Sequence, residues 1–405
     1  MDKNEQIRQS GSATRLKRRM QQYRTFRFKI NRSHLRADQL ECIKMMFVEC
    51  KRLYNYILGA GMIPDPKDYK QYKHITYLDR NKNVVDYDLS RIGSSIIQDQ
   101  IRVMNESVHA LSVRKKKGYD VGPLRFKSEC NSIRLFQYGI THRIVGNRIK
   151  IQGIKRPIYL SGLKQLSKYN EIDYTTAHLL WDGNDYYISL TCFVPKEQYD
   201  CSGSIGIDMG VSTHITFSDG RKQNVTIEES ERLKGLQRLL EKKKNRSNNW
   251  YKVRSKIKKE YAKMNNKKND AANKIVHDLK RYETVVIQDE QLSSWDKKTI
   301  QHSILGRIKS KLIHRPNVYI LDRWFPATQY CPSCGTYTPH DTSKRKFECS
   351  CCHSISDRDI HAANNMLEML NKILSAGTVG VKPCKKIRFD SVRMCFSRKG
   401  NHIGL

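Results

Sequence analysis

The sequence predicts a multi-domain protein in which an all-β part precedes an α/β part. Short β-rich runs separated by turn residues fill residues 118–198. After residue 199, buried-strand patterns alternate with helical patterns, which is typical of α/β folds. A helical block at residues 36–117 separates an early strand pattern from the β-rich runs. With 405 residues, the chain is long enough for two or three domains.

The N-terminal half is predicted to begin with a loose basic arm at residues 1–21. Alternating apolar residues at 23–30 indicate a strand, which we expect to join the β-rich runs in a β-barrel. Apolar residues at helical spacing predict one helix over residues 40–57 and another over 94–112. The clearest hairpin is HLLWDGNDYYISLTCFV, in which two β-rich runs flank the turn 182–185.

The second half is predicted to contain the strands and helices of an α/β domain. A hairpin is expected at 204–217, and the runs TVVIQDE and NVYILDRW indicate two further strands. A very basic helical stretch spans residues 228–282, where Trp250 and Tyr251 lie among lysines and arginines. Such a stretch is typical either of a solvated helix face or of a helical hairpin that faces nucleic acid, and the aromatic residues favour the second. The last helix is predicted at 359–374.

The charge of the chain favours a polyanionic partner. Lys and Arg number 75 against 40 Asp and Glu, so the formal net charge is +35. Because such repulsion opposes a compact state, a neutralising polyanion is expected, and nucleic acid is the leading interpretation. The sequence shows neither an apolar stretch of about 20 residues nor a signal-peptide pattern, so we expect a cytoplasmic location and no membrane partner.

A cysteine-rich window predicts a structural zinc site. Its motifs CPSCG and CSCCH each hold a Cys-x-x-Cys pair, and the four paired residues are Cys331, Cys334, Cys349 and Cys352. Two such pairs can bring four thiolates around one tetrahedral Zn²⁺, and a closed site of four sulfurs is structural rather than catalytic. Cys351 is expected to be a bystander, while His340 and His353 are alternative ligands.

Three acidic residues on separate predicted elements point to a metal-dependent nuclease. Asp208 ends the first strand in GIDMGV, an acid follows the apolar run of TVVIQDE, and Asp359 opens the last helix. Taken singly, they are ordinary turn, helix-start and N-cap residues. Taken in this order, they match the three carboxylates of an RNase H-like nuclease domain, which can bind two Mg²⁺ ions and hydrolyse a phosphodiester.

Several stretches together resemble the TnpB family, the transposon-encoded, RNA-guided DNA nucleases from which compact type V CRISPR effectors derive. The resemblance covers nearly the whole chain and implies an RNA-guided DNA endonuclease with a RuvC-type site. The stretches that carry it are RLYNYIL, GPLRFKS, GIDMGV with its SDG turn, TVVIQDEQL, CPSCG with FECSCC, DRDIHAANN and AGTVG.

The resemblance also implies a domain order. A wedge-type β-barrel with an inserted helical recognition domain precedes an RNase H-like RuvC domain with an inserted zinc ribbon. The implied boundaries are a basic flexible N-terminus at 1–21, a wedge-like barrel at 22–35 and 118–198, a helical recognition domain at 36–117, a nuclease domain at 199–326 and 355–375, a zinc ribbon at 327–354 and a basic C-terminal tail at 376–405.

The resemblance assigns the catalytic roles as well. Asp208 and Asp359 match the first and third metal-binding carboxylates of the family. Many members have a glutamate directly after the apolar run, where this chain has Gln288. In a variant family pattern that reads Gln-Asp-Glu, the glutamate is the metal ligand. Glu290 is therefore predicted as the middle ligand and Asp289 as the alternative.

Residues next to the predicted metal ligands, and those of the RLYN motif, also have expected roles. Asp357 is expected beside the metal site, Arg358 is expected to steady phosphate charge, and His361 stands where the family often has Asn. The RLYN motif offers three residues that either contact DNA or belong to the core and helix surface, namely Arg52, Tyr54 and Asn55.

The implied partners are a guide RNA and a double-stranded target DNA, with guide pairing beside a short motif supplying the specificity. The implied cofactors are two catalytic Mg²⁺ ions and one structural Zn²⁺. The alternatives are a compact type V CRISPR effector with an array-derived guide, and a cleavage-deficient RNA-guided DNA-binding protein. The resemblance implies a prokaryotic cytoplasm, with nucleoid association on DNA, and leaves monomer and dimer open.

Overall fold

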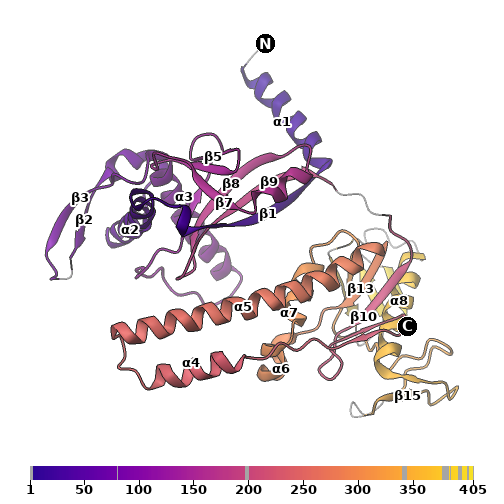
Figure 1. Ribbon diagram of the computed structural model, residues 1–405. Coiled ribbons are helices and arrows are strands. Elements are labelled where there is room, and N and C mark those ends of the chain that lie inside the picture. Colours follow the sequence, from indigo (N-terminus) through magenta and orange to yellow (C-terminus); the bar gives the residue numbers. More distant parts are fainter. Residues whose placement is uncertain are drawn as a thin grey trace. The chain divides into compact units, whose positions relative to one another are not determined.

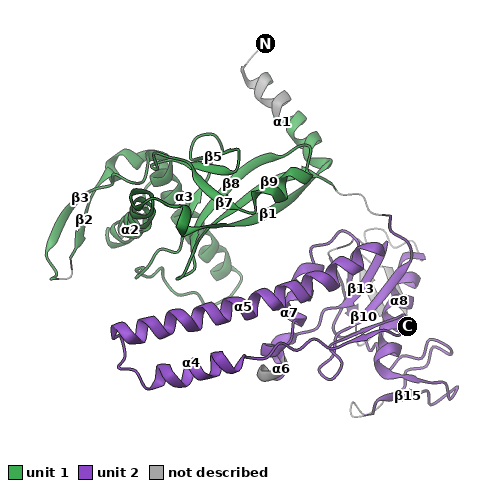
Figure 2. Ribbon diagram, in the orientation of Figure 1, with its two compact units in different colours: residues 1–197 green, residues 198–405 purple. Residues whose placement is uncertain are grey.

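The computed structural model (Figure 1) describes residues 3–79, 81–196, 200–339, 344–375, 383, 385–390, 395–398 and 401–404. The chain divides into two compact units, Met1–Glu197 and Gln198–Leu405 (Figure 2). Within the described ranges, no helix has the length and apolar character needed to cross a bilayer. His340, an alternative zinc ligand, lies outside the described residues.

Unit 1 is built on a barrel-like antiparallel sheet with the strand order β4-β8-β9-β1-β7-β6-β5. Strand β1 pairs with β9 on one side and β7 on the other, so the early strand joins the later β-rich runs, as predicted. Alternation buries Phe28 and Ile30 of β1 completely. The strands are β1 (Gln21–Ile30), β4 (Ser132–Leu135), β5 (His142–Val145), β6 (Arg148–Ile151), β7 (Ile158–Ser161), β8 (Asp173–Trp181) and β9 (Tyr186–Pro195).

Two long helices and a hairpin share the core of this sheet. Apolar side chains of the helices α2 and α3 form one buried cluster with those of the strands, as the helical spacing predicted. Glu49 of α2 is fully buried, and its carboxylate accepts the backbone N–H groups of Ser90, Arg91 and Ile92. The elements are α2 (Ala37–Gly59), β2 (His74–Leu78), β3 (Val84–Asp88) and α3 (Ser94–Lys116).

The N-terminal segment predicted as a loose arm contains a helix, α1 (Lys3–Arg19). Basic residues fill its last turn, where their positive charges interact favourably with the negative end of the helix dipole. Two of them also form ion pairs with Asp173 of β8, Lys17 at 3.0 Å and Arg18 at 2.7 Å. These interactions, which a local sequence pattern does not reveal, explain the difference.

Unit 2 is built on a mixed sheet with the order β12-β11-β10-β13-β14-β17. The four strands β10, β13, β14 and β17 are parallel, while β11 and β12 extend the sheet in antiparallel fashion. The strands are β10 (Ser204–Asp208), β11 (Ile215–Phe217), β12 (Lys222–Gln223), β13 (Thr284–Gln288), β14 (Val318–Leu321) and β17 (Lys386–Ile387). Because β17 pairs with β14, part of the segment predicted as a basic tail belongs to the sheet.

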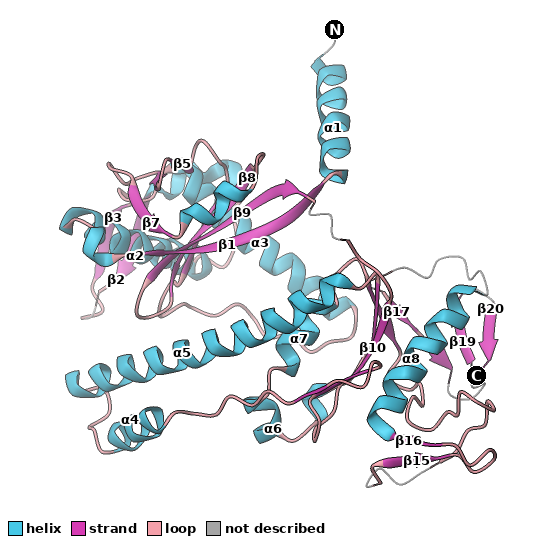
Figure 3. Cartoon of the chain, turned by 45° about the vertical axis from the view of Figure 1, so that its right-hand side comes forward, coloured by secondary structure: helices cyan, strands magenta, loops and turns pink. Residues whose placement is uncertain are grey.

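Helices cover both faces of this sheet (Figure 3). Ile205, Ile207 and Ile287 point to the face that α5 and α7 cover, whereas Val286 and Leu321 point to the face that α8 covers. Helix α4 packs on α5 through a smaller apolar cluster, so the basic stretch forms a helical hairpin. The helices are α4 (Glu231–Glu241), α5 (Asn248–Asp278), α6 (Lys297–His302), α7 (Leu305–Leu312) and α8 (Arg358–Ser375).

Helix α8 lies directly against β10 because Gly206 has no side chain. A Cβ at Gly206 would lie 2.0 Å from the carbonyl oxygen of Ala363 in α8, a distance that real Cβ atoms do not show. This close approach sets the end of β10 beside the first turn of α8. The hairpin of β15 (Lys346–Glu348) and β16 (Ile355–Asp357) leads straight into that turn.

Candidate functional site

Three carboxylates from distant parts of the chain line one pocket of unit 2. Asp208 ends β10, Glu290 follows β13, and Asp359 lies in the first turn of α8. All three line a pocket of about 360 Å³ at the carboxyl ends of the parallel strands. In open α/β sheets, this is the edge at which functional side chains gather. The pocket therefore brings together the three acids that the sequence predicted.

The carboxylates of this pocket repel one another. Burial, and then the nearby charges of Asp359 and Glu290, raise the pKa of Asp208 to about 7. Burial also raises the pKa of Glu290. The Arg358 guanidinium partly offsets the repulsion, since it lies 3.1 Å from the Asp359 carboxylate. A site that raises carboxyl pKa values in this way favours the binding of a cation.

The donor set of the pocket fits a hard divalent cation. Carboxylate oxygens are the protein ligands that Mg²⁺ prefers. The oxygens of the three acids are spaced more widely than the four sulfur atoms of the cysteine cluster described below. Among the described residues, that cluster is the group whose ligand atoms all lie within 4.8 Å of one another. Asp208, Glu290 and Asp359 are the pocket residues that would hold such a cation.

The two acids after β13 have different surroundings. Asp289 does not line the pocket; its carboxylate lies 2.7 Å from Lys309 and 3.2 Å from Lys386. Burial alone would raise the pKa of Asp289, but the hydrogen bonds from these two lysines hold it below its ordinary value. Glu290 lines the pocket, so the geometry favours it over Asp289 as the middle carboxylate.

The hydrogen-bond partners of the Gln288 side chain are acceptors that a glutamate could not satisfy. Its side-chain amide is buried and donates to three backbone carbonyls that follow β14, those of Asp322 at 3.0 Å, Arg323 at 3.2 Å and Phe325 at 2.8 Å. A carboxylate has no N–H to donate. Gln288 therefore holds the loop after β14 rather than facing the acidic pocket.

The first turn of α8 is fixed by its own neighbours. Asp357 caps the helix, since its carboxylate accepts the backbone N–H groups of Asp359 and Ile360 at 3.1 Å each. His361 is buried and stacks on Phe347 of β15, with ring centroids 3.8 Å apart. Its Nε2 also lies 2.8 Å from the carbonyl oxygen of Tyr330. Both residues position the helix turn that carries Asp359.

Four thiols converge beside this turn. The Sγ atoms of Cys331, Cys334, Cys349 and Cys352 all lie within 4.8 Å of one another. The backbone N–H of Cys352 contributes most to lowering the pKa of the Cys349 thiol to about 6, which favours the thiolate that a metal ligand requires. Four convergent sulfurs fit a tetrahedral Zn²⁺. Neither Cys351 nor His353 is part of this group.

Comparisons with known proteins match the parts of the chain that carry both sites. Residues 194–292 match the OrfB_IS605 family, described as "Probable transposase", and residues 306–366 match "Cas12f1-like, TNB domain". A "Putative RNA-guided DNA endonuclease" of Streptomyces pristinaespiralis is 30% identical over 200 residues, which cover 45% of this chain and 49% of that relative. The resemblance to the TnpB family is confirmed.

A second TnpB-type relative agrees with the first. "Putative RNA-guided DNA endonuclease InsQ" of Escherichia coli (strain K12) is 29% identical over 227 residues, which cover 47% of this chain and 56% of that protein. The chain thus spans about half the length of the curated relatives it matches.

Two solved structures are similar over most of their length at low identity. A cryo-EM structure of the Cas12f1-sgRNA-target DNA complex gives a TM-score of 0.41 at 11% identity, covering 85% of this chain and 98% of that chain. A cryo-EM structure of CasPhi-2 (Cas12j) bound to crRNA and phosphorothioate-DNA gives a TM-score of 0.37 at 10% identity, covering 86% and 91%.

The RLYN motif of the TnpB resemblance is mostly occupied with contacts inside unit 1. The Arg52 guanidinium lies 3.7 Å from the ring centroid of Tyr77. Tyr54 is buried, and the Asn55 side chain exchanges two hydrogen bonds with the backbone of Lys127. These contacts favour the core and surface interpretation of the motif over direct DNA contact.

Four further residues line the acidic pocket that the TnpB motifs did not single out: Ser212 and Thr213 in the loop after β10, and Thr328 and Arg345. Thr328 follows the loop after β14, and Arg345 directly precedes β15. Arg345 also donates a hydrogen bond to Ser212, in the loop after β10. The sequence signal for Arg345 was weak, because it lies among other basic residues of the cysteine-rich window.

Proposed function

We propose that this protein is an RNA-guided DNA endonuclease with a RuvC-type active site at Asp208, Glu290 and Asp359. The observation that carries the proposal is that these three carboxylates, far apart in sequence, line one pocket beside Arg358. The names of the curated relatives support the same activity. The guide RNA and double-stranded target DNA are the proposed partners, and the net charge of +35 suits both.

In this proposal, the chain's own residues position the reacting phosphodiester. Two Mg²⁺ ions, when bound by the three carboxylates, supply a nucleophilic water and stabilise the leaving oxygen. Arg358 and Arg345 line the same pocket and contribute positive charge toward a phosphate. Gly206 and the Asp357 cap hold the first turn of α8 beside β10, which keeps Asp359 opposite Asp208.

The domain scheme belongs to the proposal as well. Unit 1 would comprise the wedge-type barrel with its helical insertion, and unit 2 would comprise the RNase H-like RuvC domain. The four cysteines would hold one structural Zn²⁺ in the ribbon that precedes α8. An array-derived guide, as in a compact type V CRISPR effector, is the alternative that shares this chemistry, and the place of action is the cytoplasm, on the nucleoid.

The activity is tested by Asp208→Asn in the full chain purified with its guide RNA. Cleavage of matched DNA in Mg²⁺ should fall by at least about 100-fold, the scale on which a lost charge-stabilising group slows an enzyme. RNA and DNA binding should persist, as measured by filter binding. Asp270→Asn, which removes an exposed carboxylate of α5 outside the pocket, is the matched control and should cleave normally. Undiminished cleavage by Asp208→Asn would refute the assigned site.

The middle ligand is tested by comparing Glu290→Gln with Asp289→Asn. Glu290→Gln should abolish cleavage because it removes a pocket carboxylate. Asp289→Asn should retain most of the activity, because its charge is committed to Lys309 and Lys386. Loss of cleavage in Asp289→Asn alone would reverse the assignment. Full cleavage by both variants would contradict either residue as the middle ligand, whereas absence of cleavage by the unsubstituted chain would favour a cleavage-deficient DNA-binding protein.

A further inference from the structure

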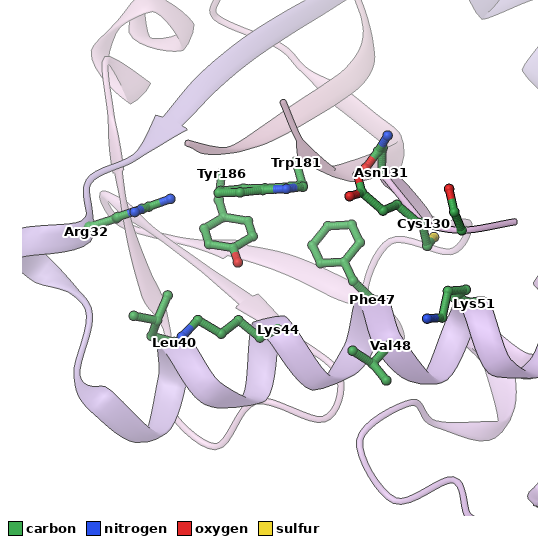
Figure 4. A pocket seen from close by; sticks show the side chains of 12 residues that line it. Arg32, Leu40, Lys44, Phe47, Val48, Lys51, Cys130, Asn131, Trp181 and Tyr186 are labelled. Atoms are coloured by element: carbon green, nitrogen blue, oxygen red, sulfur yellow. The ribbon is translucent and has the colours of Figure 1, made fainter. Parts of the chain in front are cut away.

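Unit 1 contains a pocket whose lining residues come from residues 32–51, 128–131 and 181–186. It has a volume of about 470 Å³ and lies between α2 and the hairpin of β8 and β9 (Figure 4). This volume is within the range of about 300–1,000 Å³ that small-molecule sites occupy. Its walls combine aromatic rings with basic side chains, and none of the interactions described so far uses this combination.

The aromatic wall is a cluster of three rings, of which Tyr186 and Phe47 are buried and Trp181 is half-buried. The ring centroids of Trp181 and Tyr186 lie 4.4 Å apart, and the Phe47 ring lies 5.9 Å from that of Tyr186. In the described part of the chain, neither the Trp181 Nε1–H nor the Tyr186 hydroxyl has a protein hydrogen-bond partner. Figure 4 shows the three rings gathered at the same cavity. Trp181 is therefore the most exposed ring of this wall.

Basic side chains flank these rings. Arg32 lies over Trp181, with its guanidinium carbon 5.2 Å from the ring centroid. Lys44 and Lys51 reach the pocket from α2, and within the described ranges neither forms an ion pair with a carboxylate. Glu129 is the acid among the described lining residues, so positive charge prevails. The lysines are therefore available to an anion from outside the chain.

We propose that this pocket binds one unpaired nucleotide of a nucleic acid, with its base on Trp181 and its phosphate near Lys44 and Lys51. A nucleotide supplies a flat ring and an anion in one covalent unit, which matches the two walls. An apolar ligand would leave both lysines without a counter-charge. The inference rests on the proposed function in that it takes RNA or DNA as the ligand, and the nucleotide comes from the guide RNA or from the displaced DNA strand.

Stacking is tested with a cycle of two proteins and two probes. The full chain and its Trp181→Ala variant are titrated with a short oligouridylate and with an abasic chain of the same phosphate count. Trp181→Ala should weaken oligouridylate binding by at least about fivefold, the lower end of stacking contributions, and should leave binding of the abasic chain unchanged. Trp181→Phe should restore most of the loss. Tyr119→Ala, an exposed aromatic outside the pocket, is the control.

Oligothymidylate in place of oligouridylate distinguishes the two sources. The coupling is the loss of affinity that Trp181→Ala causes for the base-bearing probe beyond its loss for the abasic probe. If this coupling appears only with the ribo-probe, the nucleotide belongs to the guide RNA. If it appears only with the deoxy-probe, the nucleotide belongs to the displaced strand. Equal coupling means that base and phosphate alone are recognised. If Trp181→Ala weakens the base-bearing and abasic probes equally, or weakens neither, the inference is wrong.

Lys44→Ala provides a second, independent test should Trp181→Ala fold poorly. It should weaken binding of both probes and lower the slope of log affinity against log salt by about 0.7, as expected for one lost phosphate contact on a single strand. An unchanged slope contradicts the phosphate assignment. These assays need no cleavage, so a protein that cleaves DNA but shows no coupling refutes the pocket alone. One that shows coupling without cleavage refutes only the nuclease.

Discussion

Three consecutive polar residues after the apolar run of β13 have three different environments. Gln288 donates to backbone carbonyls after β14, Asp289 pairs with Lys309 and Lys386, and Glu290 lines the acidic pocket. Their roles follow from partners that lie about 20 to 100 positions away in sequence. The sequence alone predicted Glu290 only by analogy with a family variant, and the contacts now supply a physical reason for preferring it.

Gln288→Glu tests this division at the residue scale. The substitution removes a donor from three buried carbonyls and buries a charge, so the free energy of unfolding of unit 2 should fall by about 3 kcal/mol. Cleavage should not improve, because the side chain faces the loop after β14. Thermal or urea unfolding with a cleavage assay measures both effects. A glutamate that is neutral for stability and raises activity would contradict the assignment.

At the scale of elements, the contact between β10 and α8 sets the geometry of the acidic pocket. The strand contributes Asp208 and the helix contributes Asp359, and Gly206 lets the two backbones approach. The sequence predicted both elements from their patterns but not their contact. The role of a glycine in a strand pattern cannot be assigned until the position of the neighbouring backbone is known.

Gly206→Ala should separate these two elements. Its Cβ would meet the Ala363 carbonyl at 2.0 Å, and the resulting overpacking should cost about 1–3 kcal/mol. The cleavage rate should fall by more than the loss of folded protein accounts for, because Asp359 moves with α8. Gly235→Ala in α4 is the matched control: no atom lies within 4 Å of its Cβ, so helix propensity should stabilise that variant slightly. Unaltered cleavage by Gly206→Ala would contradict the role of this contact.

The cysteine hairpin adds a second prediction at this scale. The double substitution Cys331→Ser and Cys334→Ser should release one zinc per chain, measured by plasma mass spectrometry, and should lower the unfolding temperature of unit 2. Cys351→Ser is the matched control, since Cys351 is exposed and outside the cluster. Unchanged zinc content in the double variant would refute the metal site.

At the scale of the whole molecule, the sequence predicted more of the elements than of their partners. The periodic patterns located β1, α2, α3, the hairpin of β8 and β9, and the strands β10, β13 and β14, because apolar spacing reports burial directly. The patterns missed α1 and β17, which are held by ion pairs and by an edge pairing distant in sequence. The pocket in unit 1 was also beyond them, since Trp181 and Lys44 meet only in the fold.

The net charge of +35 makes a prediction for the complete chain. If six to ten phosphates are contacted, affinity for nucleic acid should fall by about 10³-fold or more between 50 and 200 mM salt, because bound counterions are released on binding. Filter binding with oligonucleotides at several salt concentrations measures the slope. A flat response would count against extended contacts with the phosphate backbone.

The central claim is that Asp208, Glu290 and Asp359 jointly bind divalent cations at a phosphodiester. The most direct measurement is anomalous diffraction from crystals of the guide-loaded protein grown with Mn²⁺ in place of Mg²⁺. We predict density for the metal about 2 Å from carboxylate oxygens of all three residues. Cleavage-competent crystals whose metal density lies away from these residues would contradict the claim.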